Sequence, residues 1–165
     1  MKADPYSIKR RARPEKVFTF DDGQGFECHL NLRRFGVTGS TAIEPRASEM
    51  CRKHVTGSGP LKKDGTLDTE SPAYVAPEFI GMVDGEPVEL TYATCVVVAT
   101  IELAQTEWED DSRYTFKELA LMCASDRVAF QMMEASNWVG PDDPTEDDGQ
   151  GNQVKDGDRP SLNTA

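Results

Sequence analysis

The chain has 165 residues, with 18 lysines and arginines against 29 aspartates and glutamates, and its formal net charge is −11 at pH 7. This is the length of one ordinary domain, alone or with tails, so two full domains are not expected. Hydrophobic residues make up 38% of the sequence, and no uncharged apolar run approaches the ~20 residues of a membrane-spanning helix. These values exclude an integral membrane protein and predict a soluble one.

The two ends of the chain carry opposite charge. Residues 1–16 contain six basic and two acidic side chains, whereas residues 141–165 contain seven acidic and two basic ones. From this charge we expect residues 1–15 to form a flexible basic leader, and they lack the apolar core that a secretion signal requires. Residues 140–165 contain one valine and one leucine, too little apolar surface to offset the entropy of ordering them, which predicts a disordered acidic tail. The folded body then covers residues 16–139.

Charge and cysteine usage also limit the partners and the compartment. The four cysteines have irregular spacing that does not form a disulfide framework, which favours a reducing, cytoplasmic compartment. The overall negative charge repels nucleic acid and anionic lipid, so neither is expected as a partner. The basic stretch IKRRARPEK is a possible local exception, although a solvated leader that tempers the negative charge is the preferred interpretation.

The body begins with a predicted β-hairpin over residues 16–32. The runs KVFTF and FECHLNL are rich in alternating apolar residues and are joined by DDGQG, whose aspartates and glycines accept positive φ. Side chains alternate along a strand, so Phe26, Cys28, Leu30 and Leu32 share one face, which we expect to be buried.

The middle of the chain predicts a helix, a loop and a smaller hairpin. Pro45 suits the first turn of a helix, and apolar residues follow at helical spacing, which predicts a short helix over 45–54. Residues 56–72 are almost all Gly, Ser, Thr, Pro or charged, which indicates a surface loop. A small second hairpin is expected around Asp84 and Gly85.

The next segment is open to two interpretations. Thr91 is a candidate N-cap, and apolar residues recur at helical spacing up to Trp108, but the run Cys95–Val98 also suits a buried strand. An uninterrupted run of this length exceeds an ordinary strand, so we predict a helix over 92–108.

The last part of the body predicts a pair of helices over 116–138. Thr115 and Glu118 form a capping box, and Ser125 with Asp126 gives a second capping signal at which the helix kinks or restarts. The order of elements predicts an α+β fold in which N-terminal β-hairpins pack with a C-terminal helical part.

Both histidines lie close to cysteines, which raises the possibility of a metal site. Cys28 precedes His29, and Cys51 stands three residues before His54, so four side chains have the chemistry of zinc ligands. Adjacent residues on a strand point to opposite faces, so Cys28 and His29 cannot share one metal without a bulge. We therefore predict a buried thiol beside an exposed imidazole, and no metal or cofactor. A zinc module using Cys28, Cys51 and His54 remains an alternative.

The sequence offers no catalytic constellation. Cys95 and Cys123 lie in apolar helices with no neighbouring base and are expected to be unreactive packing thiols. The chain has no serine in a Gly-x-Ser-x-Gly context and no glycine-rich loop between a strand and a helix for phosphate. We therefore expect a protein that is not an enzyme.

The predicted C-terminal helices carry more apolar side chains than a small core requires. Methionines beside aromatic residues give a flexible apolar surface of the kind that holds varied hydrophobic segments. The alternative is a plain helical core in which methionine fills space. The candidate partner-binding residues are Phe116, Leu119, Met122, Phe130, Met132, Met133 and Trp138.

The layout of the chain has a counterpart in a known family. A basic leader, the segments VFTF, GFECHLNLRR, DGEPVELT and YTFKELALMCASDRVAFQMMEASNWV, and an acidic end together resemble the tail assembly chaperones of long-tailed bacteriophages, over residues 16–139. The resemblance implies a non-enzymatic protein of the infected host cytoplasm. Such a protein coats the helical tape-measure protein and keeps it soluble until tube subunits polymerise around it. In several such families a frameshifted longer form also exists.

A second class of function stays open beside the chaperone. A structural virion component, such as a tail or head-tail joining protein, would order its tails on assembly and would self-associate into rings or tubes. A chaperone would remain small alone and bind a helical client.

Overall fold

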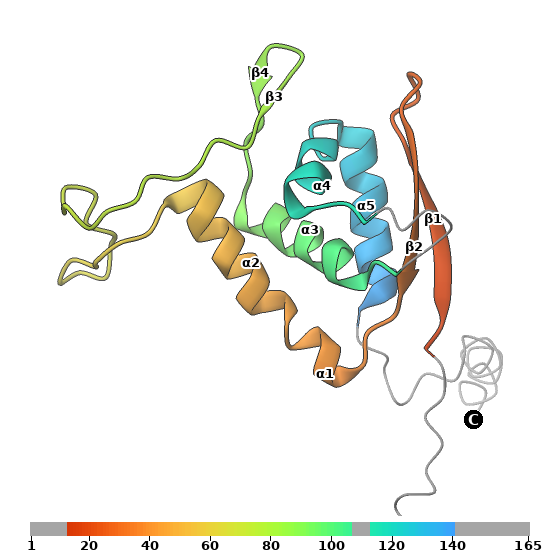
Figure 1. Ribbon diagram of the computed structural model, residues 1–165, viewed down its shortest axis with the longest axis horizontal. Coiled ribbons are helices and arrows are strands. Elements are labelled where there is room, and N and C mark those ends of the chain that lie inside the picture. Colours follow the sequence, from red (N-terminus) through yellow and green to blue (C-terminus); the bar gives the residue numbers. More distant parts are fainter. Residues whose placement is uncertain (1–12, 107–112, 141–165) are drawn as a thin grey trace, which may run out of the picture.

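The computed structural model describes residues 13–106 and 113–140. The predicted basic leader and acidic tail therefore lie almost entirely outside the described residues, as does the segment 107–112. Within the described residues, a two-stranded β-hairpin stands against a group of helices, and a long arm leaves the group on the opposite side (Figure 1). This arrangement confirms the predicted α+β fold.

The N-terminal hairpin pairs β1 (Glu15–Asp21) with β2 (Glu27–Arg33) in antiparallel register, with Phe18 opposite Leu30. The turn is held by Asp22, whose Oδ1 accepts hydrogen bonds from the Gln24 and Phe26 amides at 2.8 and 3.0 Å. The predicted hairpin is confirmed, and Cys28, Leu30 and Leu32 are buried as expected. Phe26 is the exception: it lies in the turn just before β2 and is 41% exposed.

The connection after the hairpin contains more helix than the sequence predicted. A short α1 (Val37–Ser40) precedes α2 (Ile43–Cys51), which continues as the π-helical turn η2 (Arg52–Thr56). The predicted helix over 45–54 therefore starts two residues early, with Pro45 in its first turn, where its missing N–H costs nothing.

An arm of residues 57–90 follows and extends away from the helices (Figure 1). At its base Ser58 and Val75 exchange two backbone hydrogen bonds of 2.9 and 2.7 Å. Further on, β3 (Met82–Val83) and β4 (Glu86–Pro87) form the small hairpin that the sequence predicted. Its two turn residues, Asp84 and Gly85, have φ values of 53° and 81°, which is the backbone of a type I′ turn. Thr56 ends η2, and the rest of the predicted loop 56–72 contains no helix or strand, as expected.

The helix α3 (Tyr92–Ala104) settles the ambiguous segment in favour of a helix. The Thr91 hydroxyl caps it by accepting from the Thr94 amide at 3.2 Å. The helix ends four residues before the predicted Trp108, because Gln105 turns away to form a bridge with Leu32 of β2.

The capping box of Thr115 and Glu118 is present and begins α4 (Phe116–Met122). A short turn at Cys123–Ser125 separates α4 from α5 (Asp126–Val139). The predicted pair of helices over 116–138 is thus confirmed, with the break where the sequence placed it.

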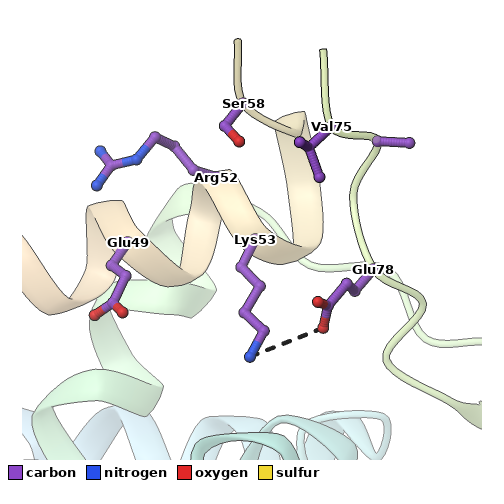
Figure 2. Close-up of a pocket in the computed structure, with 7 residues that line it drawn as sticks. Glu49, Arg52, Lys53, Ser58, Val75 and Glu78 are labelled. Atoms are coloured by element: carbon purple, nitrogen blue, oxygen red, sulfur yellow. Dashed lines mark ion pairs between the residues drawn. The ribbon is translucent and has the colours of Figure 1, made fainter. Parts of the chain in front are cut away.

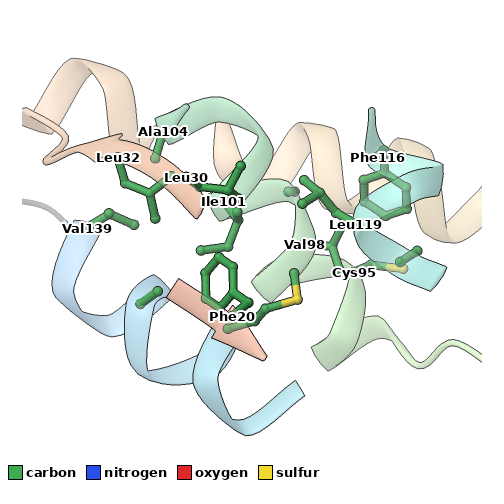
Figure 3. Close-up of a cluster of buried hydrophobic side chains, with 14 of the residues drawn as sticks. Phe20, Leu30, Leu32, Cys95, Val98, Ile101, Ala104, Phe116, Leu119 and Val139 are labelled. Carbon is green, nitrogen blue, oxygen red and sulfur yellow. The ribbon is translucent and has the colours of Figure 1, made fainter. Parts of the chain in front are cut away.

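The core surrounds α3, which lies against α2, α4, α5 and β2. Figure 3 shows Leu30 and Leu32 of the hairpin beside Ile101 of α3, and Leu119 of α4 beside Val98 of α3. On the rim of this core the Arg46 guanidinium makes a bidentate pair with Glu102, at 2.7 and 3.0 Å, which joins α2 to α3. The hydrogen bonds from Glu102 raise the pKa of Arg46 above its usual value.

Candidate partner-binding surface

The structure does not bring the seven candidate partner-binding residues together on one surface. Phe116, Leu119 and Met132 are 3%, 0% and 0% exposed and belong to the core. These three residues were wrongly placed on a binding surface, because they are already covered by the chain's own side chains. Met122 and Trp138 are partly buried against the core, and Phe130 and Met133 are exposed.

The inner face of α5 explains the burial of Met132. Val128, Met132, Ala135 and Val139 are all buried, and their spacing places them along one side of the helix. Met132 also has its Sδ 3.5 Å from the Sγ of Cys123, in the turn before α5. This stripe is visible in the sequence, and it would have separated Met132 from its exposed neighbours.

Trp138 fastens the end of α5 to the hairpin. Its ring meets the edge of Phe18 at a centroid distance of 5.2 Å, and the Arg34 guanidinium lies 4.9 Å from the centre of the Trp138 ring. Trp138 is thus partly buried by contacts within the fold.

Phe130 and Met133 form the α5 outer face, with 56% and 44% of each residue exposed. They are one helical turn apart and point the same way. Two contacts orient the helix so that this face stays open: Arg127 pairs with Asp21 at 3.1 Å, and the Gln131 Oε1 accepts the Asp21 amide at 2.8 Å. The hairpin therefore covers one flank of α5 and the core another, and the α5 outer face is left to solvent.

The arm carries further exposed apolar side chains that the sequence analysis did not propose as a site. They are Leu61, Val75, Phe79, Met82 and Val83, which are 36–66% exposed. The arm is nonetheless seated on the body, since Gly81 lies so close to Leu121 that an added Cβ would come within 2.8 Å of its Cδ2. The sequence did contain a signal for these exposed residues. The run EFIGMV is apolar, and the small hairpin that it leads into is too short to bury it.

A shallow pocket lies where the arm meets η2. Figure 2 shows Glu49, Arg52, Lys53 and Glu78 around it, with Lys53 and Glu78 paired at 3.8 Å. Its volume is about 240 Å³. Two acidic and two basic side chains offset one another here, so the pocket has neither the excess charge that holds an ion nor an activated nucleophile.

The residues of the zinc alternative have separate partners. Within the described ranges no three histidine, cysteine or acidic side chains form a group that could hold a metal ion. Burial raises the pKa of the Cys28 thiol, with Tyr114 acting in the opposite direction, and Cys51 adds to the raised pKa of Cys95. His54 stacks on Phe116 at 6.1 Å, and its Nδ1 lies 3.2 Å from the carbonyl oxygen of Glu78.

The two thiols expected to be unreactive are in settings that agree with that expectation. Burial raises the pKa of Cys95 and of Cys123 to about 11. At pH 8 their thiolate fraction is then about 100-fold below that of an ordinary exposed thiol, and the thiolate is the reactive form. We predict that iodoacetamide leaves both unlabelled in the native protein and labels both in urea, as read by peptide mass spectrometry. Native labelling as fast as in urea would contradict this assignment.

No protein-family model, curated protein or solved structure matches this chain. Over residues 13–106 and 113–140, no helix combines the length and the apolarity needed to cross a bilayer. Function therefore has to be argued from the site itself.

Proposed function

We propose that this chain is a non-enzymatic binding protein that covers the apolar stripe of a helical client. The specific assignment is a tail assembly chaperone of a long-tailed bacteriophage, acting in the host cytoplasm, with the tape-measure protein as its client. The binding residues are then the α5 outer face, with the exposed apolar residues of the arm as a second contact region.

The observation that carries this proposal is the exposure of Phe130 and Met133 on a helix whose inner stripe is already filled. Neither side chain is needed to close the core, because Val128, Met132, Ala135 and Val139 do so. An exposed aromatic ring beside a methionine gives an apolar helix face on which the apolar stripe of another helix can pack, and the flexible thioether adapts to varied apolar side chains.

Charge and polar satisfaction support the same kind of function. The net charge of −11 keeps a complex with an apolar client soluble. Among the described side chains, every buried polar atom has a hydrogen-bond partner, so the interior offers no unpaired group aimed at a small ligand. What the described surface offers instead is apolar contact area.

The proposal is tested by co-expression with a tape-measure fragment. The intact chain is expected to move the fragment from the insoluble to the soluble fraction. The double variant F130S/M133S is expected to lose most of this rescue while keeping its own solubility and helical circular dichroism. A matched control is V37S, because Val37 is also exposed, at 69%, but lies on α1; this variant should rescue the fragment as the intact chain does.

Two results would overturn the assignment. The first is full rescue of the fragment by both F130S/M133S and F79S/M82S, because the exposed apolar residues would then not contribute to client binding. The other is assembly of the purified chain into rings or tubes without a client, which is the behaviour of a structural virion component.

A further inference from the structure

The two edges of the N-terminal hairpin differ in how they are covered. β1 and β2 form a sheet of two strands. The far edge of β2 is protected, since the Asn31 carbonyl accepts the Thr106 amide at 2.9 Å and Leu32 forms a bridge with Gln105. Within residues 13–106 and 113–140, no backbone segment pairs with the other edge of β1. An uncovered strand edge is a template on which another strand can pair.

The hydrogen bonds of the hairpin show which residues of β1 bond to β2. In an antiparallel pair, residues that bond to the partner strand alternate with residues that point away from it. The Arg34 amide donates to the Pro14 carbonyl at 3.1 Å. At the other end of the hairpin, the Asp22 amide donates to the Phe26 carbonyl at 3.3 Å. The even-numbered residues of β1 therefore bond to β2.

The odd-numbered residues of β1 consequently turn their amides and carbonyls to the uncovered edge. The Asp21 amide agrees with this direction, because it donates to the Gln131 side chain at 2.8 Å. Glu15, Val17 and Thr19 are exposed, and their backbone groups bond to no other described segment. The edge between residues 15 and 19 thus offers a row of donors and acceptors, with a β-branched residue at its centre.

We propose that a second copy of this chain pairs its own β1 antiparallel with this edge, so that two hairpins form one four-stranded sheet about a twofold axis at Val17. The pairs are then Glu15 with Thr19, Val17 with Val17, and Thr19 with Glu15, which exchange up to about six backbone hydrogen bonds. Each hairpin contributes one uncovered edge, so the pair is closed and does not grow into rings or tubes. The pairing does not depend on the proposed client.

Charge selects this register among those that the hydrogen-bond pattern allows. Outward-pointing residues have to pair with outward-pointing residues, so an axis near the middle of β1 lies at Lys16, Val17 or Phe18. An axis at Lys16 would place the two lysines directly opposite each other. An axis at Phe18 would place Glu15 opposite Asp21 of the second copy. Like charges in directly opposite positions destabilise a sheet, which leaves the axis at Val17.

The selected register also places complementary groups opposite each other. Arg13 stands opposite Asp21 of the second copy, and Lys16 stands opposite Phe18, where a cation near an aromatic ring is favourable. Within one chain the Lys16 Nζ already lies 5.0 Å from the centre of the Phe18 ring. The two Val17 residues, each 41% exposed in the single chain, cover each other at the axis. A second copy therefore fits this edge in both charge and apolar contact.

The first test is the mass of the full chain in solution, measured by analytical ultracentrifugation from micromolar to millimolar concentration. The intact chain is expected to reach the mass of two chains. V17P is expected to stay at the mass of one chain with unchanged circular dichroism, because proline removes only an N–H that points away from β2. The matched control is V37P, since Val37 is the exposed first residue of α1, a position that tolerates proline; this variant should pair as the intact chain does.

Two results of this measurement would overturn the proposal. One is a single chain at every concentration. The other is a V17P variant that forms the pair as readily as the intact chain, because the uncovered edge would then not be where the copies meet.

The second test fixes the register by cysteine cross-linking. At the axis the two Val17 Cα atoms are about 5.5 Å apart, within the range of a disulfide, so V17C is expected to give a covalent dimer on oxidation. T19C is the control on the same strand, because the two copies of this residue are four positions out of step, about 13 Å apart, and should give none. Equal cross-linking of V17C and T19C would contradict this register and the proposal with it.

Discussion

Replacing Met132 with alanine is expected to lower the free energy of unfolding by about 2–5 kcal/mol, the range for removing a large apolar side chain from a packed core. Met132 is 0% exposed and lies between Val128 and Ala135 on the inner face of α5, with Cys123 against its sulfur. The side chain that is removed leaves a cavity that the surrounding helices can only partly close. Urea denaturation followed by circular dichroism gives the value.

The neighbouring residue is the matched control for this prediction. Met133 is 44% exposed, so its replacement by alanine is expected to change the free energy of unfolding by no more than about 0.5 kcal/mol. Comparable losses for the two variants would show that α5 is rotated relative to the orientation described above. The division between core and α5 outer face would then be wrong.

Replacing Gly57 with alanine is expected to cost about 1–3 kcal/mol from backbone strain alone. Gly57 has φ 76° and ψ −177°, a region that is essentially restricted to glycine. An added Cβ would also lie 2.5 Å from the carbonyl oxygen of Val75, so the two backbone segments at the base of the arm would have to move apart. The expected result is faster hydrogen exchange at the Ser58 and Val75 amides, whose mutual hydrogen bonds close the base.

The control for Gly57 is another glycine of the arm with positive φ. Gly65 has φ 85°, but an added Cβ would meet nothing within 4 Å. Its replacement by alanine is therefore expected to leave exchange at Ser58 and Val75 unchanged and to destabilise the protein less. If both variants left exchange at the base unchanged, the close approach of Gly57 to Val75 would be refuted.

Local patterns were sufficient to predict most of the elements. Alternation in FECHLNL identified the buried face of β2, since each inward residue is apolar and each outward one polar. The capping box of Thr115 and Glu118 fixed the start of α4 because both of its hydrogen bonds lie within one turn of chain. For α3, the β-branched residues Val96, Val97 and Val98 favoured a strand, but the length of the uninterrupted run correctly predicted a helix.

Features set by contacts between distant segments were not predictable in the same way. The end of α3 depends on Gln105 meeting Leu32 of β2, a contact between parts of the chain far apart in sequence. The meeting of Pro14 and Val139 at Arg34 and Phe35 likewise depends on how the hairpin docks on α5. No local signal in either segment reports such a contact.

The candidate partner-binding surface was partly predictable from local sequence and partly dependent on contacts between distant segments. Its aromatic and methionine composition was read from the sequence, but which of these side chains remain exposed depends on the rotation of α5. Arg127 and Gln131 set that rotation through Asp21 of β1. The same contacts bury Met132 and expose Met133, so a surface expected to contain seven residues is reduced to Phe130 and Met133 together with partly buried edges.

The most direct measurement of the central claim is site-specific photo-cross-linking to a tape-measure fragment in the co-expressed complex. A photoreactive phenylalanine analogue at position 130 is expected to give a covalent product with the client, whereas the same group at the exposed position 37 on α1 should give none above background. If the client stays soluble while position 130 yields no more product than position 37, the α5 outer face is not where the client binds.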